Sequence, residues 1–416
     1  MREQLTALRR LMAAGGIDAY LVPTDDFHGS EYVGDYFKCR SYLSGFTGSA
    51  GTLLVLADWA GLWTDGRYFL QAEAQLRGSG ITLCKMGEKD VPTEEAFLQD
   101  HLQEGQCLAF DGRTVTARRF HALERALGGK KIRLRTDIDL AGALWQDRPP
   151  LSAAPAWELG TEYCGRSRAD KLSAIRRSLA EKGAEELLLS SLDDIAWLLN
   201  IRGGDVDCCP VVLSYFALRA GSACLFVNPA VLPAPLRDAL ARDGVTIAPY
   251  DAVYDYAAQI ASGSRVWLDE EKTNCALWQA VAGRGCDILS APNPPALPKA
   301  IKHAAEAANE RAAHVRDGVA VTRFLYWLKH QVGRTPITER SAAAHLEQLR
   351  SAQEHYLGPS FDPIIAYAAH GAIVHYSATE ESDCALAPDS FLLCDTGGHY
   401  LEGTTDITRT VALGPV

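Results

Sequence analysis

The chain has 416 residues, of which 47% are hydrophobic and 22% are charged, so it can bury substantial cores, and typical domain sizes predict about two to four domains. Its formal net charge of -11, without a long block of Lys or Arg, excludes a basic face for a nucleic-acid backbone. The N-terminal sequence MREQLTALRRLMAAGG lacks the apolar core of a signal peptide, and no segment approaches the ~18 apolar residues of a membrane span, so we expect a soluble cytoplasmic protein.

Helices and strands alternate in the first part of the chain. Helices are expected at Gln4–Ala14, from Tyr68, at Thr93–Leu102 and at Ala117–Leu127, and strands at DAYLVP, TLLVLA, GLWT, ITLCKM, CLAFD and IRLRTD. This alternation predicts an α/β layer structure. The proline-rich segment Asp147–Pro155 is expected to be a linker, which places a first module at residues 1–154.

A similar order of elements returns after the linker. The sequence RRLMAAGGIDAYLVPTDD near the start is echoed by RRSLAEKGAEELLLSSLDD from Arg176, YLSGFTGS is echoed by WLLNIRGG, and the strand GTLLVLA is echoed by SACLFVN. We therefore predict two homologous modules in tandem. The second occupies residues 155–298 and closes with the proline-rich break Ala291–Pro298.

The third region, residues 299–416, opens with a long helix. Its apolar residues recur near the helical period at Val315, Val319, Leu325, Leu328 and Val332. Thr338 is expected to cap a second helix that runs through Leu349. Short strands are predicted to follow at PIIAY, AIVHY, SFLLCD and TTDITRTVAL.

The eleven cysteines include no CxxC pair. Cys84, Cys107 and Cys224 lie in apolar strand-like segments, which predicts reduced thiols in the core. Cys208 and Cys209 are adjacent, and neighbouring side chains on a strand point to opposite faces, so this pair does not indicate a metal or redox site.

The candidate chemistry lies in SFLLCDTGGHYLEGTTDITRTVAL, which we interpret as a hairpin turning near Tyr400 and Leu401. A register symmetric about that turn places Asp395 directly opposite Asp406. Like charges whose Cβ atoms are ~4.5–5.5 Å apart destabilise a sheet, so one divalent cation or a pair of them is expected between the carboxylates. The alternative is a solvent-exposed hairpin whose aspartates and threonines face water.

Five separated motifs resemble the cytosolic-type Xaa-Pro aminopeptidases, the aminopeptidase P family, in the right order over nearly the whole chain: SGFTGSAGT, WTDGRYFLQA, NIRGGDV, GAIVHYSA and DTGGHYLEGTTDITRT. The resemblance implies a fold that mixes α/β and α+β: two tandem creatinase-N-like α/β modules, followed by an incomplete pita-bread catalytic domain. It also implies two divalent metal ions, with Mn²⁺ as the expected metal. It further implies a homodimer and peptides with proline at the second position as substrates.

The resemblance gives roles to individual residues. Asp395 and Asp406 match two metal ligands, and the second of these bridges the ions in that family. His375 matches a histidine that contacts the bound peptide, and Arg67 matches a substrate-contacting arginine of the first module. From the residues alone, Arg67 would be half of a surface salt bridge and His375 a hydrogen-bonded histidine at a strand edge, although a guanidinium fork does suit a peptide carbonyl or carboxylate.

The family also needs a histidine and two glutamates from strands that follow the hairpin, and a further histidine as a proton shuttle. His370, His399 and Glu402 do not stand in those positions, so no catalytic residue is assigned. We therefore expect a truncated or partial chain that supplies half of a dinuclear site and is inactive alone.

Two other functions stay open. A non-catalytic member of the fold would use the peptidase-like groove to bind peptides or proteins, but such a member is expected to lose the aspartates and His375. A prolidase or a creatinase would share the aspartates, whereas the paired modules and WTDGRYF favour aminopeptidase P.

Overall fold

The structure is a computed structural model that describes residues 2–415. It divides into two compact units, and each unit has its own apolar core. Unit 1 comprises residues 2–158, 168–206 and 210–300, and unit 2 comprises residues 159–167, 207–209 and 301–415.

The first half of unit 1 is built on a six-stranded sheet in the order β4-β3-β2-β1-β5-β6. Strand β1 runs antiparallel to β2 and parallel to β5, and all of its residues are buried, as is typical of a strand covered on both faces. The strands β1 to β6 are Ala19–Pro23, Thr52–Leu56, Ala60–Thr64, Thr82–Lys85, Cys107–Ala109 and Arg133–Arg135. The helices α1 to α6 are Glu3–Ala14, Cys39–Ser44, Phe69–Gln75, Glu94–His101, Ala117–Leu127 and Leu140–Leu144, with 3-10 helices η1 at Asp35–Phe37 and η2 at Gly128–Lys130.

The second half of unit 1 repeats this topology in the order β12-β11-β10-β8-β13-β14. Strand β8 again runs antiparallel to one neighbour, β10, and parallel to the other, β13, so the expected tandem repeat is confirmed. The strands β7 to β14 are Trp157–Glu158, Glu186–Leu189, Ile201–Arg202, Ser214–Arg219, Ala223–Val227, Val245–Ala248, Arg265–Leu268 and Asp287–Ser290. The helices α8 to α13 are Arg168–Glu181, Leu192–Leu199, Ala234–Arg242, Ala252–Ala257, Cys275–Ala282 and Ala296–Ala300, with η3 at Pro229–Val231.

One detail of the predicted repeat is wrong. The segment GTLLVLA forms β2, whose counterpart by position in the sheet is β10, whereas SACLFVN forms β11, the counterpart of β3. Strands β10 and β11 are the two arms of one antiparallel hairpin, and both are mostly buried. Apolar content therefore does not distinguish them, and only the pairing of β10 with β8 does.

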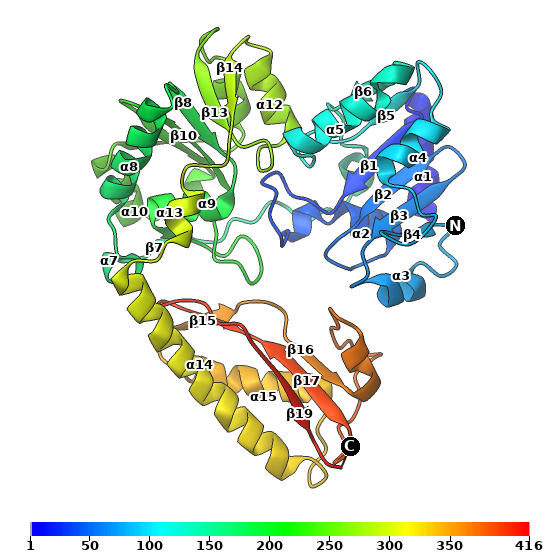
Figure 1. Ribbon diagram of the computed structural model, residues 1–416, viewed down its shortest axis with the longest axis vertical. Helices are drawn as coiled ribbons and strands as arrows, with labels where there is room; N and C mark the ends of the chain where they lie inside the picture. Colours follow the sequence, from blue (N-terminus) through cyan, green and yellow to red (C-terminus); the bar gives the residue numbers. More distant parts are fainter. Residues whose placement is uncertain (1, 416) are drawn as a thin grey trace. The chain divides into compact units, whose positions relative to one another are not determined.

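Backbone hydrogen bonds join the two halves of unit 1 where α5 and α12 begin (Figure 1). The carbonyl of Val115 accepts from the amide of Cys275 at 2.7 Å, and the amide of Ala117 donates to the carbonyl of Thr273 at 2.9 Å. These bonds restrict how the starts of α5 and α12 are oriented toward each other, because a backbone acceptor must lie close to the line of the N–H bond.

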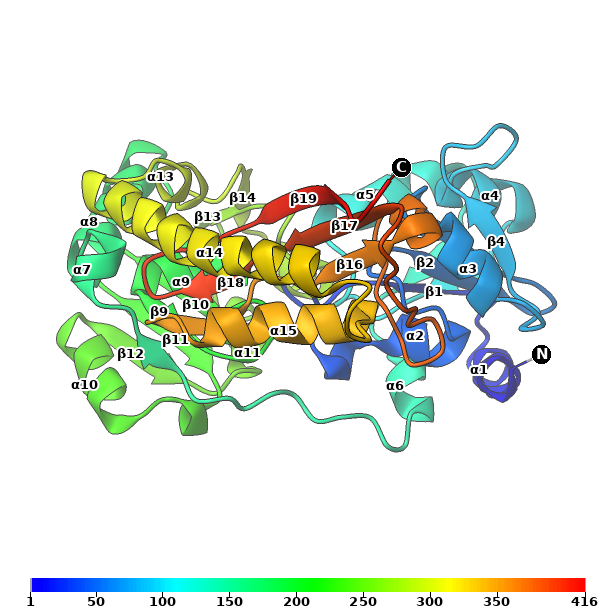
Figure 2. The ribbon, with the colours of Figure 1, turned by 90° about the horizontal axis from the view of Figure 1, so that it is seen from below.

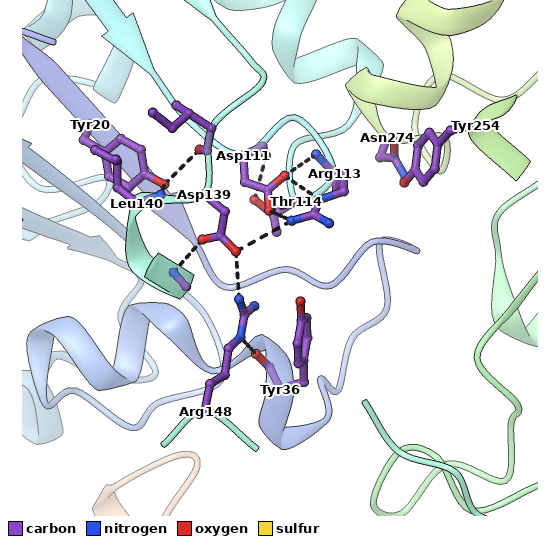
Figure 3. A network of polar contacts seen from close by, with 12 residues as sticks. Tyr20, Tyr36, Asp111, Arg113, Thr114, Asp139, Leu140, Arg148, Tyr254 and Asn274 are labelled. Carbon is purple, nitrogen blue, oxygen red and sulfur yellow. Dashed lines mark hydrogen bonds and ion pairs between the residues drawn. The ribbon is translucent and has the colours of Figure 1, made fainter. Parts of the chain in front are cut away.

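A partly buried network of charges stabilises the first half of unit 1 (Figure 3). Arg113 binds both carboxylate oxygens of Asp111, and Arg148 donates to Asp139 at 2.7 Å and to the carbonyl of Tyr36 at 2.8 Å. A distance of 3.6 Å between Arg113 and Asp139 links the two pairs. The acids and bases of this network match one another, so we assign it a role in folding rather than in chemistry.

In unit 2, two long helices pack on a three-stranded sheet in the order β16-β17-β19 (Figure 2). The helices are α14, Ala304–Gln331, and α15, Glu339–Ser351, and the strands are β16, Ile364–Tyr367, β17, Phe391–Thr396, and β19, Ile407–Ala412. The short helix α7, Thr161–Cys164, and the paired strands β15, Tyr356–Pro359, and β18, Gly398–Tyr400, complete the unit. Its core combines residues of both helices and the sheet, among them Phe324, Leu328, Leu346, Ile365 and Leu392.

The long helix of the third region is confirmed, but two residues of the apolar stripe assigned to it are not buried. Val315 is 67% exposed and Val319 is 42% exposed. The face that packs inward is instead Ala313, Asp317, Ala320, Phe324 and Leu328. The small alanines let α15 approach, and the stripe includes one charged residue, Asp317.

The strand predicted at AIVHY is also wrong. After β16 the chain turns at Ala368, whose φ is 51°, and forms the 3-10 helix η4 at Ala368–Ala372. His375 follows in an exposed turn. The apolar side chains of this segment do not all face the core, since Val374 is 57% exposed, whereas Tyr376 is buried by its contact with Glu339.

The cysteines agree with the prediction of reduced thiols. Within residues 2–415 none of the eleven forms a disulfide; Cys84 and Cys107 are buried as expected, whereas Cys224 is only half-buried. Burial raises the pKa of the Cys84 thiol to about 11, which keeps it protonated at neutral pH. Over residues 2–415, no helix has both the length and the apolar character that crossing a membrane would require.

Candidate metal centre

The hairpin of β17 and β19 holds the two aspartates, in a register that differs from the prediction. Asp395 lies opposite Thr408, not opposite Asp406. The bridge between His399 and Thr404 shows that the turn is centred one residue later than assumed. A turn shifted by one residue changes each pairing by two, and this keeps every side chain on its original face of the sheet. Asp395 and Asp406 are therefore diagonal neighbours on the same face.

The two carboxyl groups interact in spite of the shifted register. Partial loss of hydration raises the pKa of Asp406, which is still largely exposed, and the charge of Asp395 and a hydrogen bond between the two side chains raise it further. Thr408 donates its hydroxyl to Asp395 at 2.8 Å. In the part of the chain that the structure describes, no Lys or Arg forms an ion pair with either aspartate. Among the described residues, the negative charge of this pair is therefore not balanced by a neighbouring cation.

Strand β17 presents Asp395 on the face that does not pack on the helices. Leu392 and Cys394 alternate with it, are buried, and belong to the apolar core formed with α14 and α15. Asp395 is half-buried on the opposite face together with Leu393, and Asp406 is exposed. A ligand or an ion can reach this face without displacing core residues.

A buried ion pair holds the hairpin from beneath. Asp317 on α14 is fully buried and accepts from Arg350 Nε at 2.6 Å and from Arg350 Nη2 at 3.1 Å. The same carboxylate accepts from the hydroxyls of Tyr400 at 3.2 Å and Thr405 at 2.8 Å. Arg350 also donates to Thr396, which directly follows Asp395. This network fixes both ends of the loop between the two aspartates.

Sequence reasoning missed Asp317 and Arg350. The available signal was a charged residue inside an apolar helical stripe, because Asp317 lies three to four residues from Ala313 and Ala320 on one face of α14. Such a residue needs a buried partner, and Arg350 provides it.

The glycines of the DTGG sequence allow the hairpin arms to come close. A β-carbon at Gly397 would lie 2.0 Å from the carbonyl oxygen of Thr405 and 2.1 Å from Ser360 Oγ. The Gly398 carbonyl accepts from the Thr405 amide at 2.9 Å, and the Thr405 hydroxyl accepts from the Gly398 amide at 2.9 Å. Any larger residue at position 397 would push the aspartates apart.

The other acidic and imidazole groups of the hairpin are bonded elsewhere. Glu402 forms an ion pair with Arg316 at 2.5 Å and a hydrogen bond with His355 at 2.6 Å. Burial alone would raise the pKa of Glu402, and these two contacts lower it below its usual value. His399 bonds Thr404 through Nδ1 and the carbonyl of Cys208 through Nε2. Neither residue is directed at the aspartate pair.

His375 lies three residues after η4, which packs against β17. A β-carbon at Gly371 of this 3-10 helix would be 4.0 Å from Leu393 Cβ, on the same face of β17 as Asp395. The segment that carries His375 therefore starts from the open face of the sheet.

Arg67 belongs to unit 1 and is described within it. It follows β3 and donates two hydrogen bonds to the carboxylate of Asp65, each 2.8 Å long, which raise its pKa. It lies at the edge of a cavity of about 700 Å³, a volume typical of a ligand pocket. Other lining residues include Asp25, Trp63, Met86, Glu94 and Arg119.

Comparison with known families accounts for the whole chain in three segments. Residues 4–147 and residues 147–306 each match the Creatinase/Prolidase N-terminal domain, and residues 308–416 match metallopeptidase family M24.

Individual relatives agree with these matches. The probable Xaa-Pro aminopeptidase P of Verticillium alfalfae is 36% identical over 422 residues, which cover 99% of this chain and 69% of that protein. Aminopeptidase P1 of Arabidopsis thaliana is 35% identical, and the alignment covers 100% of this chain and 71% of that protein. The crystal structure of X-prolyl aminopeptidase from Caenorhabditis elegans, described as a cytosolic enzyme with a di-nuclear active site, superposes with a TM-score of 0.93 at 32% identity and covers 99% of this chain and 69% of that one.

Proposed function

Because this chain belongs to the Xaa-Pro aminopeptidase P family of M24 metallopeptidases, we propose that it supplies the N-terminal modules and two metal ligands of an enzyme that releases the first residue from peptides with proline second. The observation that carries the proposal is the contact between Asp395 and Asp406 on an open face of the sheet. Two carboxylates that repel each other, with no protein cation between them, are suited to binding metal.

Asp395 and Asp406 would hold the metal ions. The hydroxyl of Thr408 would keep the Asp395 carboxylate in place. An all-oxygen donor set fits Mn²⁺ or Mg²⁺ better than soft metals, and we propose Mn²⁺. Divalent ions held there would supply Lewis-acid chemistry, polarising a carbonyl and lowering the pKa of a bound water. Asp317 and Arg350 hold the hairpin and so position both aspartates without touching substrate.

The 416 residues alone should bind Mn²⁺ weakly and should not hydrolyse peptides. Two aspartates offer at most four oxygens, whereas catalytic metal sites need further ligands and an ordered second shell. The family resemblance requires one histidine and two glutamates besides the aspartates. We propose that a segment carrying these three residues completes the site.

His375 and Arg67 are the proposed peptide-binding residues. His375 would donate to the bound peptide from the exposed turn after η4, and Arg67 would use its planar fork at the edge of the cavity in unit 1. We further propose that the complete enzyme acts in the cytoplasm as a homodimer.

The test uses a chimera in which the C-terminal segment of a relative follows the hairpin of this chain. With Mn²⁺ it should cleave a peptide with proline second, and a matched peptide with alanine second should be cleaved far more slowly. The 416-residue chain should cleave neither. Hydrolysis by the chain alone would contradict the ligand assignment, and a folded chimera that binds the peptide without cleaving it would favour a binding protein.

Two variants of the chimera test the peptide-binding residues. His375→Ala should lower kcat by ~10²–10³, the usual cost of removing a group that stabilises developing charge. Arg67→Met should raise KM by about tenfold with little change in kcat, because a charged hydrogen bond contributes ~1.5–3 kcal/mol. If a variant has the same kcat and KM as the parent, the substituted residue does not bind the peptide.

A further inference from the structure

A cluster of three metal-binding side chain types lies in unit 2, outside the hairpin. Glu339 begins α15, His370 is in η4, and Cys384 is in the segment before β17. The donor atoms of these three residues all lie within 4.8 Å of one another. Glu339 is fully buried, and the other two are partly exposed, so the cluster can be reached from solution.

The distances in this cluster are close to those of a tetrahedral metal site. His370 Nδ1 is 2.9 Å from Glu339 Oε1 and 3.7 Å from Cys384 Sγ. Bonds of 2.0–2.3 Å from Zn²⁺ to N, O and S place neighbouring ligand atoms about 3.3–3.6 Å apart at the tetrahedral angle. The third pair of donor atoms, from Glu339 and Cys384, lies within 4.8 Å, so side-chain movements would bring all three donors to a central ion.

The surrounding contacts hold the three side chains in place. The Glu339 carboxylate also accepts from the Tyr367 amide at 2.7 Å and from the Tyr376 hydroxyl at 2.7 Å. The Glu339 amide donates to the carbonyl of Cys384 at 3.2 Å, so the two ligand-bearing segments are joined through their backbones. Hydrogen bonds to a ligating carboxylate are typical of the outer shell of metal sites.

We propose that Glu339, His370 and Cys384 form a Zn²⁺ site that is distinct from the site of the two aspartates. A thiolate, an imidazole and a carboxylate are a ligand set typical of Zn²⁺, and a water molecule can occupy the fourth position. Mn²⁺ prefers oxygen ligands, so the two sites of this chain would select different metals.

Binding exchanges protons for metal bonds. The thiol of Cys384 loses its proton to solvent, and Nδ1 of His370 gives up its hydrogen bond to Glu339 while the ring proton resides on Nε2. Burial and the neighbouring Glu339 carboxylate raise the pKa of the Cys384 thiol to about 11, so the ion must offset the cost of forming the thiolate. The thiolate and the carboxylate together neutralise the charge of one divalent cation.

The site would act as a clip on the segment that carries His375. His370 and Cys384 lie on either side of this exposed turn, and Glu339 joins both of them to the start of α15. A bound Zn²⁺ would replace the hydrogen bonds that His370 makes with Glu339 and Cys384 by three metal bonds, and it would restrict the segment between His370 and Cys384. The zinc content would then set how firmly His375 is held.

The experiment titrates the metal-free 416-residue chain with Co²⁺, a coloured substitute for Zn²⁺. We expect one equivalent to give a thiolate-to-cobalt charge-transfer band, and Zn²⁺ to abolish the band by displacement. Cys384→Ser should remove the band, and His370→Gln should weaken Co²⁺ binding by at least about tenfold. Cys286→Ser, another partly exposed free cysteine, and Asp395→Asn should leave the band unchanged.

Hydrogen exchange provides a second readout that does not depend on colour or on activity. Zn²⁺ should slow the exchange of residues 371–383 in the parent and in Cys286→Ser but not in Cys384→Ser. Absence of a thiolate band in the folded parent, or a band that survives in Cys384→Ser, would overturn the proposal and leave Glu339, His370 and Cys384 as a hydrogen-bonded cluster only.

Discussion

The hairpin of β17 and β19 takes part in two carboxylate sites, one beneath it and one on its open face. In the buried site, the carboxylate of Asp317 is fully enclosed and accepts four hydrogen bonds, two of them from Arg350. In the open site, Asp395 and Asp406 have each other and one threonine hydroxyl. Arg350 neutralises the charge of Asp317 in the buried site, whereas the carboxylates of Asp395 and Asp406 repel each other in the open site.

This difference distinguishes a carboxylate with a structural role, Asp317, from two carboxylates with a proposed functional role, Asp395 and Asp406. A buried charge persists only if the fold supplies its partners, so the arrangement around Asp317 is explained by stability alone. The pair Asp395 and Asp406 is expected to destabilise the metal-free protein, and the proposed metal ions would relieve this repulsion. The two sites share the loop between Thr396 and Thr405, so the buried one positions the open one.

The largest expected effect comes from breaking the buried site. Asp317→Ala leaves the guanidinium of Arg350 without a counter-charge and should lower the free energy of unfolding of unit 2 by ~3–5 kcal/mol. Urea unfolding followed by hydrogen exchange in unit 2 measures it. The control is Arg323→Ala on the exposed face of the same helix, which should change stability by less than ~0.5 kcal/mol.

The double variant Asp317→Met/Arg350→Met sharpens this test. It removes both charges and should recover part of the lost stability, because apolar groups of similar volume can replace a buried ion pair. A loss below ~1 kcal/mol for Asp317→Ala, or no recovery in the double variant, would contradict a structural role for the pair.

The open site should respond in the opposite way. Asp395→Asn should weaken Mn²⁺ binding to this chain by at least ~10-fold, while the free energy of unfolding of the metal-free chain stays the same or rises by ~0.2–1 kcal/mol. Isothermal titration and urea unfolding measure the two quantities. Glu380→Gln, with a side chain 82% exposed, is the matched control and should change neither. Destabilisation by Asp395→Asn would mean that Asp395 is a structural residue.

Asp25 in unit 1 provides a further carboxylate for the comparison. The fold shields it from solvent, and neighbouring positive charge only partly offsets the cost of its negative charge. Burial raises the pKa of Asp25 to about 7, and Arg119 only partly opposes the shift. A raised carboxyl pKa contributes stability below the unfolded value of about 3.9, and this stability is lost as the pH rises to 7. Asp25→Asn should therefore be more stable than the parent by ~1 kcal/mol or more at pH 8 and equal to it near pH 4. Melting temperatures across this range give the difference, and a constant difference would contradict the shifted pKa.

Local patterns predicted the elements that depend on nearby residues. Thr93 and Thr338 cap the helices that were expected to start there, and the strand expected at SFLLCD forms as β17. The predicted register of the hairpin was wrong because none of Tyr400, Leu401 and Glu402 is a residue type that fixes the position of a turn. The sequence is therefore compatible with both the predicted and the observed turn centre. The tandem sheets were predictable as a repeat, whereas the pairing of β10 with β8 was not.

The interactions that span the sequence could not be predicted. The partners Asp317 and Arg350 come from two different helices, and Glu339, His370 and Cys384 come from α15, η4 and the segment before β17. A sequence without an alignment carries no signal for such contacts beyond the presence of a charged residue in an apolar stripe.

The smallest expected effect is the pH dependence of the open pair. The pKa of Asp406 is raised by partial loss of hydration and by the charge of Asp395, so its contribution to stability is present below about pH 3.9 and is lost as the pH rises through the shifted value. In metal-free protein, Asp406→Asn should therefore melt slightly above the parent at pH 7, and the two melting curves should converge as the pH falls toward 4. Saturating Mn²⁺ should reverse the order at pH 7, because the cation stabilises only the protein with both carboxylates. All other carboxyl groups are common to both proteins and cancel in the difference. If Asp406→Asn melts below the parent without metal, the two carboxylates attract rather than repel, and the contrast between the buried and the open site fails.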